Sequence, residues 1–188
     1  MRLQPAVFLD RDGVINEDRD DYVKSWAEYT FYPGALAALQ RLHAAGCEVY
    51  LVTNQAGVGH GAMSRRALQD ILLRLRVTVR RRGGLLHGIA FCPHRRDEGC
   101  GCRKPRAGML RKLAFKYGLD LARSVIVGDS CGDIQCGQAV GCRTILLHTR
   151  PPDGVGQHLG SCERPPDHQC ASLAEAVDLV LRLPQFHR

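Results

Sequence analysis

Short apolar segments alternate with amphipathic stretches along most of the chain. The apolar segments have the length of buried strands, and they cover residues 5–10, 48–54, 87–93, 124–130 and 143–149. The amphipathic stretches predict helices over residues 35–46, 64–79, 107–118, 133–141 and 172–183. Strands that alternate with helices are typical of a parallel sheet covered on both faces.

The predicted fold is therefore α/β, a three-layer Rossmann-like arrangement with a mainly parallel sheet. The length of 188 residues suits a single domain over residues 1–188, and no internal repeat is present. Residues 150–170 are rich in Pro, Gly and His and are expected to form a loop. About 40 residues separate the first strand end from the second, and about 50 separate the second from Lys104, so we expect no separate cap domain.

The net charge of +7 fits an anionic ligand, either a phosphorylated molecule or a nucleic acid. Part of this charge lies on or just after one predicted helix, where a solvated basic helix end explains it as well, and the residues are Arg74, Arg76, Arg80, Arg81 and Arg82. We expect a cytoplasmic monomer, because we find no signal-peptide pattern, no apolar run near ~18 residues and no exposed apolar stripe. Disulfides are not expected there, although nine cysteines are present.

Polar residues follow three of the predicted strands, in the segments "LDRDG", "VTNQAG" and "VGDSCGD". The carboxyl ends of parallel strands meet at one edge of the sheet, where ligands of such folds bind. Asp10 and Asp12 in the first segment and Asp129 in the third would place carboxylates together there, and Mg²⁺ would offset their charge. The alternative is that either N-terminal aspartate only caps a turn.

A carboxylate can also attack phosphorus, and a second one can exchange protons with the leaving group and with water. The charge that develops on the transferring phosphoryl group then needs donors, which Thr53, Asn54 and Lys104 could supply. Each of these three also has an ordinary interpretation, since Thr-Asn is a common turn pair and lysine is usually exposed.

Three cysteines and one histidine crowd into residues 92–102, and they are Cys92, His94, Cys100 and Cys102. Three sulfur ligands and one nitrogen ligand are a set that structural Zn²⁺ takes, with no position left for substrate. The alternative is a chance cluster in a cysteine-rich chain. A metal here would fix a loop that leads directly into Arg103 and Lys104.

The segments "FLDRDGVIN", "VTNQAGVG", "CRKP" and "VGDSCGD" together resemble the four motifs of the haloacid dehalogenase-like phosphatases. More narrowly, "CPH" followed by "CGCRKP" resembles the D-glycero-D-manno-heptose-1,7-bisphosphate 7-phosphatases and the related histidinol-phosphate phosphatases. The resemblance runs from residue 5 to about residue 149 and implies an Mg²⁺-dependent phosphomonoester hydrolase acting through an aspartyl-phosphate.

The resemblance also implies individual roles. Asp10 would be the nucleophile and a Mg²⁺ ligand, and Asp12 would be the general acid and base and bind Mg²⁺ through its backbone carbonyl. Asp129 would complete the protein ligands. Thr53 and Lys104 would stabilise the phosphoryl group, and Asn54 is expected beside them. Arg103 would contact the substrate.

Residues 17–26 resemble the substrate-facing loop of the heptose phosphatases, with one residue more than expected, and the alternative is a solvated acidic loop. The candidate sugar-binding residues are Asp18, Arg19, Asp20, Asp21 and Tyr22. His60 stands where relatives often have arginine, and Ser130, expected near the phosphate, stands where several have lysine. Both differences remove a positive charge that a second phosphate group would meet.

Four functions stay open at this point. The first is removal of the 7-phosphate of a heptose bisphosphate, on the route to bacterial surface polysaccharide such as lipopolysaccharide. The second and third are hydrolysis of histidinol phosphate and of DNA 3′-phosphates. The fourth is a non-catalytic zinc module that binds nucleic acid. The shortage of aromatic stacking residues, with one Trp, five Tyr and five Phe, disfavours nucleic acid.

Overall fold

The computed structural model describes residues 3–149 and 162–186. Six parallel strands form one sheet in the order β3-β2-β1-β4-β5-β6. The strands are β1 (Ala6–Leu9), β2 (Glu48–Asn54), β3 (Gly88–Cys92), β4 (Val125–Gly128), β5 (Arg143–Leu147) and β6 (His168–Cys170). The chain builds outward from β1 in one direction and then returns to β4 and builds in the other, so the order reverses between β1 and β4.

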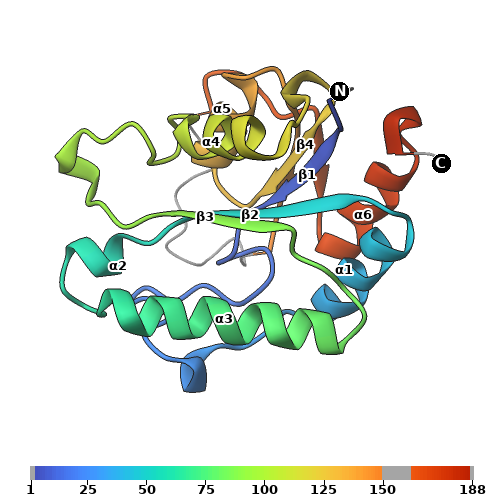
Figure 1. The fold of residues 1–188 in the computed structure, drawn as a ribbon. Helices are drawn as coiled ribbons and strands as arrows, with labels where there is room; N and C mark the ends of the chain where they lie inside the picture. The colour runs from blue at the N-terminus through green and yellow to red at the C-terminus, as the bar shows by residue number, and fades with distance from the viewer. Residues whose placement is uncertain (1–2, 150–161, 187–188) are drawn as a thin grey trace.

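Helices cover both faces of the sheet (Figure 1). The α-helices are α1 (Ala35–Ala44), α2 (Ala56–Gly59), α3 (Arg65–Arg81), α4 (Gly108–Tyr117), α5 (Cys131–Gln138) and α6 (Leu173–Leu181). Short 3₁₀ turns occur at Trp26–Glu28, Arg96–Glu98, Leu121–Arg123 and Pro184–Phe186. The predicted three-layer α/β fold is confirmed. None of the helices described has the length and apolarity needed to cross a membrane.

Alternate residues of the central strands enter two separate cores, because successive side chains of a strand point to opposite faces. Val7 and Leu9 of β1 belong to the core shared with α1, α3 and α6. Ala6 and Phe8 belong to the core shared with α4. Both faces of β1 are thus buried, which explains why its sequence is apolar throughout rather than alternating.

The structure differs from the prediction in the C-terminal tail. Residues 168–170 form β6 beside β5 rather than a loop. A disulfide joins Cys131, at the start of α5, to Cys162, with 5.2 Å between their Cα atoms, so the expectation of no disulfide is wrong. The segment before β6 meets α5, where Gln138 donates to the carbonyl of Pro165 at 2.9 Å, and sequence spacing does not reveal this contact. Residues 150–161 of the expected loop lie outside the described residues.

Candidate active site

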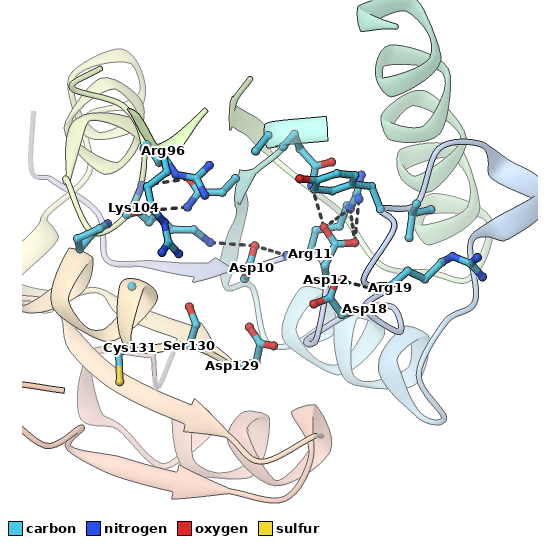
Figure 2. Close-up of a pocket in the computed structure, with 18 of the residues that line it drawn as sticks. Asp10, Arg11, Asp12, Asp18, Arg19, Arg96, Lys104, Asp129, Ser130 and Cys131 are labelled. Atoms are coloured by element: carbon cyan, nitrogen blue, oxygen red, sulfur yellow. Dashed lines mark hydrogen bonds and ion pairs between the residues drawn. The ribbon is translucent and has the colours of Figure 1, made fainter. Parts of the chain in front are cut away.

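A pocket of about 940 Å³ opens at the carboxyl ends of the central strands, where the strand order reverses. Open α/β sheets bind their ligands at this position. Figure 2 shows Arg96 and Lys104 on one side of the pocket, Arg19 on the other, and Asp10 between them. Eleven of the predicted site residues line the pocket: Asp10, Asp12, Asp18, Arg19, Asp20, Tyr22, Asn54, Arg103, Lys104, Asp129 and Ser130.

Three carboxylates lie together at the base of the site, and they come from Asp10 and Asp129, which line the pocket, and from Asp133, which is buried behind them; each has an oxygen within 4.8 Å of the others. Gly13 makes this approach possible. Its φ of +79° suits glycine, and a Cβ there would lie 2.0 Å from Oδ2 of Asp129. The donor set consists of hard oxygen atoms, which is the set that Mg²⁺ takes in proteins.

Lys104 supplies the positive charge beside these acids. Its Nζ lies 2.9 Å from Oδ1 of Asp10 and 2.5 Å from Oδ1 of Asp133, and it donates to the carbonyl of Val52 at 2.9 Å. The backbone on either side is fixed by Asn54, whose side chain accepts from the Lys104 amide and donates to its carbonyl, each at 3.1 Å. Lys104 is therefore a buried and fully positioned cation.

Burial dominates the electrostatics of this cluster. It raises the pKa of Asp10 to about 7, although the Lys104 ammonium opposes the shift. Burial and then repulsion from Asp10 raise the pKa of Asp129 to about 8. Burial alone would lower the pKa of Lys104, but the two carboxylates outweigh burial and the pKa lies above its usual value. One ammonium group thus faces three carboxyl groups, and a divalent cation would supply the further positive charge that their ionisation requires.

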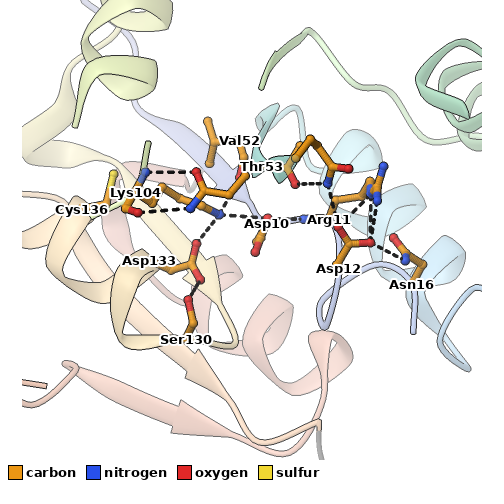
Figure 3. A network of polar contacts seen from close by, with 12 residues as sticks. Asp10, Arg11, Asp12, Asn16, Val52, Thr53, Lys104, Ser130, Asp133 and Cys136 are labelled. Atoms are coloured by element: carbon orange, nitrogen blue, oxygen red, sulfur yellow. Dashed lines mark hydrogen bonds and ion pairs between the residues drawn. The ribbon is translucent and has the colours of Figure 1, made fainter. Parts of the chain in front are cut away.

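Asp12 is held apart from this cluster by its own set of donors (Figure 3). Arg11 donates to Asp12 through Nε and Nη2, and Asn16 donates through Nδ2 at 2.9 Å. Gln55 donates from Nε2 to both Asp12, at 2.7 Å, and Thr53, at 2.8 Å. The predicted residue Thr53 is buried and does not line the pocket, although its hydroxyl joins this network.

The predicted substrate loop forms one rim of the pocket, but its side chains divide into two groups. Asp18, Arg19, Asp20 and Tyr22 line the pocket. Asp21 does not line it and instead forms ion pairs with Arg19 and Lys24 on the loop surface. Tyr22 takes a φ of 66°, unusual for a non-glycine residue, and its ring stacks on His60 at 6.3 Å between centroids.

Ser130 lines the pocket as predicted, but its hydroxyl is directed at another protein side chain. It donates to Oδ2 of Asp133 at 2.5 Å. Ser130 therefore helps to hold the buried carboxylate that pairs with Lys104.

The four residues of the cysteine cluster converge as the spacing indicates. The Sγ atom of Cys102 lies 3.3 Å from Sγ of Cys92, 3.5 Å from Sγ of Cys100 and 3.3 Å from Nδ1 of His94. Zn–S bonds near 2.3 Å and Zn–N bonds near 2.0–2.1 Å place tetrahedral ligands roughly 3.5–3.8 Å apart, so a small outward shift of these side chains would admit Zn²⁺. Arg103 donates to the carbonyl of His94 at 3.2 Å, which ties the pocket-lining cation to this loop.

Sequence reasoning did not select three buried residues of the site, namely Arg11, Gln55 and Asp133. Asp133 has a signal in the sequence, since it stands four residues after Asp129 at the start of a predicted helix. Arg11 and Gln55 have only their positions beside predicted site residues, and their contacts depend on the folded arrangement.

Comparison with known families agrees with this geometry. A model of the haloacid dehalogenase-like hydrolases matches residues 1–138, and a second, HAD-hydrolase-like model matches residues 101–176. The chain belongs to the haloacid dehalogenase-like hydrolases, and it is a phosphatase. The predicted family and enzyme class are confirmed.

Individual relatives are more specific. The chain is 44% identical over 143 residues to the D-glycero-beta-D-manno-heptose-1,7-bisphosphate 7-phosphatase of Pseudomonas aeruginosa, covering 76% of this chain and 80% of the relative. It is 39% identical over 181 residues to the enzyme of the same name from Neisseria meningitidis, covering 96% and 92%. The crystal structure of D,D-heptose 1,7-bisphosphate phosphatase from B. bronchiseptica, complexed with magnesium and phosphate, superposes with a TM-score of 0.87 at 37% identity, covering 95% of this chain and 99% of that one.

Proposed function

We propose that this chain removes the 7-phosphate of D-glycero-D-manno-heptose 1,7-bisphosphate through an aspartyl-phosphate on Asp10. The observation that carries the proposal is the juxtaposition of Asp10, Asp129 and Lys104 at the floor of the pocket. The sugar comes from the names of the relatives. A cytoplasmic location, a monomeric state and a single domain over 1–188 belong to the same proposal.

In the first step, a carboxylate oxygen of Asp10 attacks phosphorus while the bond to the leaving oxygen breaks. Asp12 gives its proton to that oxygen, and the sugar leaves as an alcohol. In the second step, Asp12 takes a proton from water as the water attacks the aspartyl-phosphate, which releases phosphate and regenerates Asp10. Lys104 stays beside Asp10 throughout and stabilises the developing negative charge.

Two metal ions complete the proposal. Asp10, Asp129 and the backbone carbonyl of Asp12 would hold Mg²⁺, with Asp133 close enough to share in the site. When bound, Mg²⁺ supplies positive charge to the transferring phosphoryl group. A structural Zn²⁺ would be held by Cys92, His94, Cys100 and Cys102.

The rim of the pocket supports an acidic sugar substrate. Basic side chains that line the pocket away from its acidic floor include Arg19, His60, Arg96, Arg103 and Arg106. The acidic floor takes the phosphate that reacts, so these side chains would meet a second phosphate group or sugar hydroxyls. Tyr22, stacked on His60, would add an apolar surface for the sugar ring.

The test is kcat/KM with Mg²⁺ on both anomers of heptose 1,7-bisphosphate, on histidinol phosphate and on a DNA 3′-phosphate. We expect a heptose bisphosphate to exceed the others by about 10³-fold, or about 4 kcal/mol in transition-state binding. A preference for histidinol phosphate or for DNA ends would replace the proposed substrate. Absence of Mg²⁺-dependent turnover on every phosphate ester would overturn the proposed reaction. Salt-sensitive DNA binding without turnover would instead support the nucleic-acid module.

A further inference from the structure

The Gln55 side chain connects Asp12, which follows β1, with Thr53 of β2. Gln55 is 2% exposed, and it follows β2 directly. Its backbone amide donates to the carbonyl of Cys92 at 2.7 Å, so its Cα is fixed against β3. An amide NH₂ carries two donors, and here one bonds Asp12 and the other bonds Thr53.

The two oxygens of Asp12 have different surroundings. Oδ1 accepts from Nε and Nη2 of Arg11, at 3.0 and 2.8 Å, and from Asn16 at 2.9 Å. Oδ2 accepts from Gln55 at 2.7 Å and has only a longer contact of 3.1 Å with Nε of Arg11. Oδ1 is therefore fully used as an acceptor, whereas Oδ2 keeps capacity for one more partner.

Arg11 and Gln55 also differ in charge, and this matters because Asp12 must gain and lose a proton. Arg11 is a buried cation, 1% exposed, and its charged donors bond chiefly Oδ1. Gln55 is neutral, and its N–H can donate to Oδ2 whether or not Oδ2 carries a proton. An amide at this position can therefore keep Oδ2 in one place through both protonation states that a general acid and base must pass through.

We propose that Gln55 is a positioning residue that orients Oδ2 of Asp12 as the proton-carrying oxygen and aligns it with Thr53. Arg11 and Asn16 anchor Oδ1. In the first half-reaction, the proton moves from Oδ2 to the leaving oxygen as the phosphorus–oxygen bond breaks. In the second, Oδ2 receives a proton from the attacking water. This inference rests on the proposed function, since it assigns an atom to the role of Asp12 there.

The test compares two leaving groups. An alkoxide, as in heptose 1,7-bisphosphate, needs the proton, whereas the nitrophenolate of p-nitrophenyl phosphate departs without one. The ratio kcat/KM reports the first irreversible step, which is the departure of the leaving group. For Gln55→Met, which keeps the volume and removes the donors, we expect kcat/KM to fall about 10²-fold on the sugar substrate. On p-nitrophenyl phosphate we expect a fall below about 3-fold, because general acid catalysis contributes little there.

A merely structural role would lower kcat/KM equally on both substrates, and that outcome, or no fall on either, overturns the inference. Gln138→Met is the matched control, because the Gln138 amide donates to the carbonyls of Arg164 and Pro165 and Gln138 does not line the pocket. In a double-mutant cycle on the sugar substrate, adding Gln55→Met to Asp12→Asn should cause no further loss, because the first residue acts through the second. A full additive loss contradicts the inference.

The outcomes for Gln55 are separate from those for the reaction itself. If wild-type protein hydrolyses neither ester, or if Asp10→Asn keeps full activity, the proposed function fails. If wild-type activity depends on Asp10 and the Gln55→Met losses are equal, only the role of Gln55 fails. Should Gln55→Met not fold, Gln55→Leu also removes the donors without adding a charge, and the same comparison of leaving groups decides.

Discussion

Replacing Lys104 with methionine removes the cation that neutralises the buried acids. The Lys104 side chain is 2% exposed, and its partners Asp10 and Asp133 are 12% and 0% exposed. Methionine has a similar length, so the change leaves the carboxylates in place without their counter-charge. Breaking a buried ion pair by removing one partner costs about 3–5 kcal/mol of unfolding free energy. For a domain of this size, that loss lowers Tm by about 6–20 °C.

The loss should depend on pH. Burial holds the pKa of Asp10 near 7, above its unfolded value of 3.8, so the folded protein binds more protons than the unfolded one between these values. The free energy of unfolding from this group therefore falls as pH rises through that window. Without Lys104 the pKa of Asp10 rises further, so the fall continues to higher pH and is larger in total. We expect the destabilisation of Lys104→Met to be larger at pH 8 than at pH 5.5.

The assay is urea unfolding at both pH values. The buffer contains neither Mg²⁺ nor chelator, so that the proposed zinc site keeps its metal. The same unfolding is then repeated with saturating Mg²⁺. Lys112→Met, at an exposed position of α4, is the control and should change stability by less than about 0.5 kcal/mol. Added Mg²⁺ should restore part of the lost stability at pH 8. A destabilisation below about 1 kcal/mol at pH 8, or a larger one at pH 5.5, would refute the reasoning.

Three further predictions concern the metals. The pKa values of Asp10 and Asp129 are raised to about 7 and about 8, so protons compete with Mg²⁺ for these carboxylates. Calorimetry should therefore find a Mg²⁺ affinity more than about tenfold higher at pH 8 than at pH 6. Equal affinities would contradict these shifts. Gly13→Ala should weaken Mg²⁺ binding at least about tenfold, because the added Cβ clashes with Asp129. Gly34→Ala is the control and should not weaken it, because Gly34 has nearly the same φ but nothing within 4 Å. Equal effects of the two variants would mean that backbone strain, and not the clash, weakens binding. Cys102→Ser should contain no bound zinc by elemental analysis, and its kcat/KM should be lower by about 10-fold or more. Full activity without zinc would show that the cysteine cluster does not support the active site.

The sheet was predictable because each strand carries its own signal. Residues 48–54 carry an apolar run, 49–52, between polar ends, and β2 has these bounds. The strand β6 carries no such signal, since His168, Gln169 and Cys170 are polar or small, and it forms because an edge of β5 is available for pairing. Local pattern therefore specifies the central strands, whereas the edge strand depends on tertiary context.

The candidate site divides in the same way. Asp10, Asp12 and Asp129 stand at strand ends, where the topology of parallel sheets brings side chains together. Asp133 and Gln55 have roles that depend on burial, because buried polar atoms need hydrogen-bond partners. Asp133 pairs with Lys104, and Gln55 bridges Asp12 and Thr53. Such partnerships span up to 43 positions between Gln55 and Asp12, and no spacing rule predicts them.

The central claim is that Asp10 forms a covalent phosphoenzyme. The direct measurement is rapid acid quenching after mixing the protein and Mg²⁺ with heptose bisphosphate labelled in the 7-phosphate, followed by mapping of the label. The account predicts hydroxylamine-sensitive label on Asp10 within the first turnover, and none in Asp10→Asn. Turnover in the wild-type protein without label on Asp10, or undiminished turnover in Asp10→Asn, would contradict it.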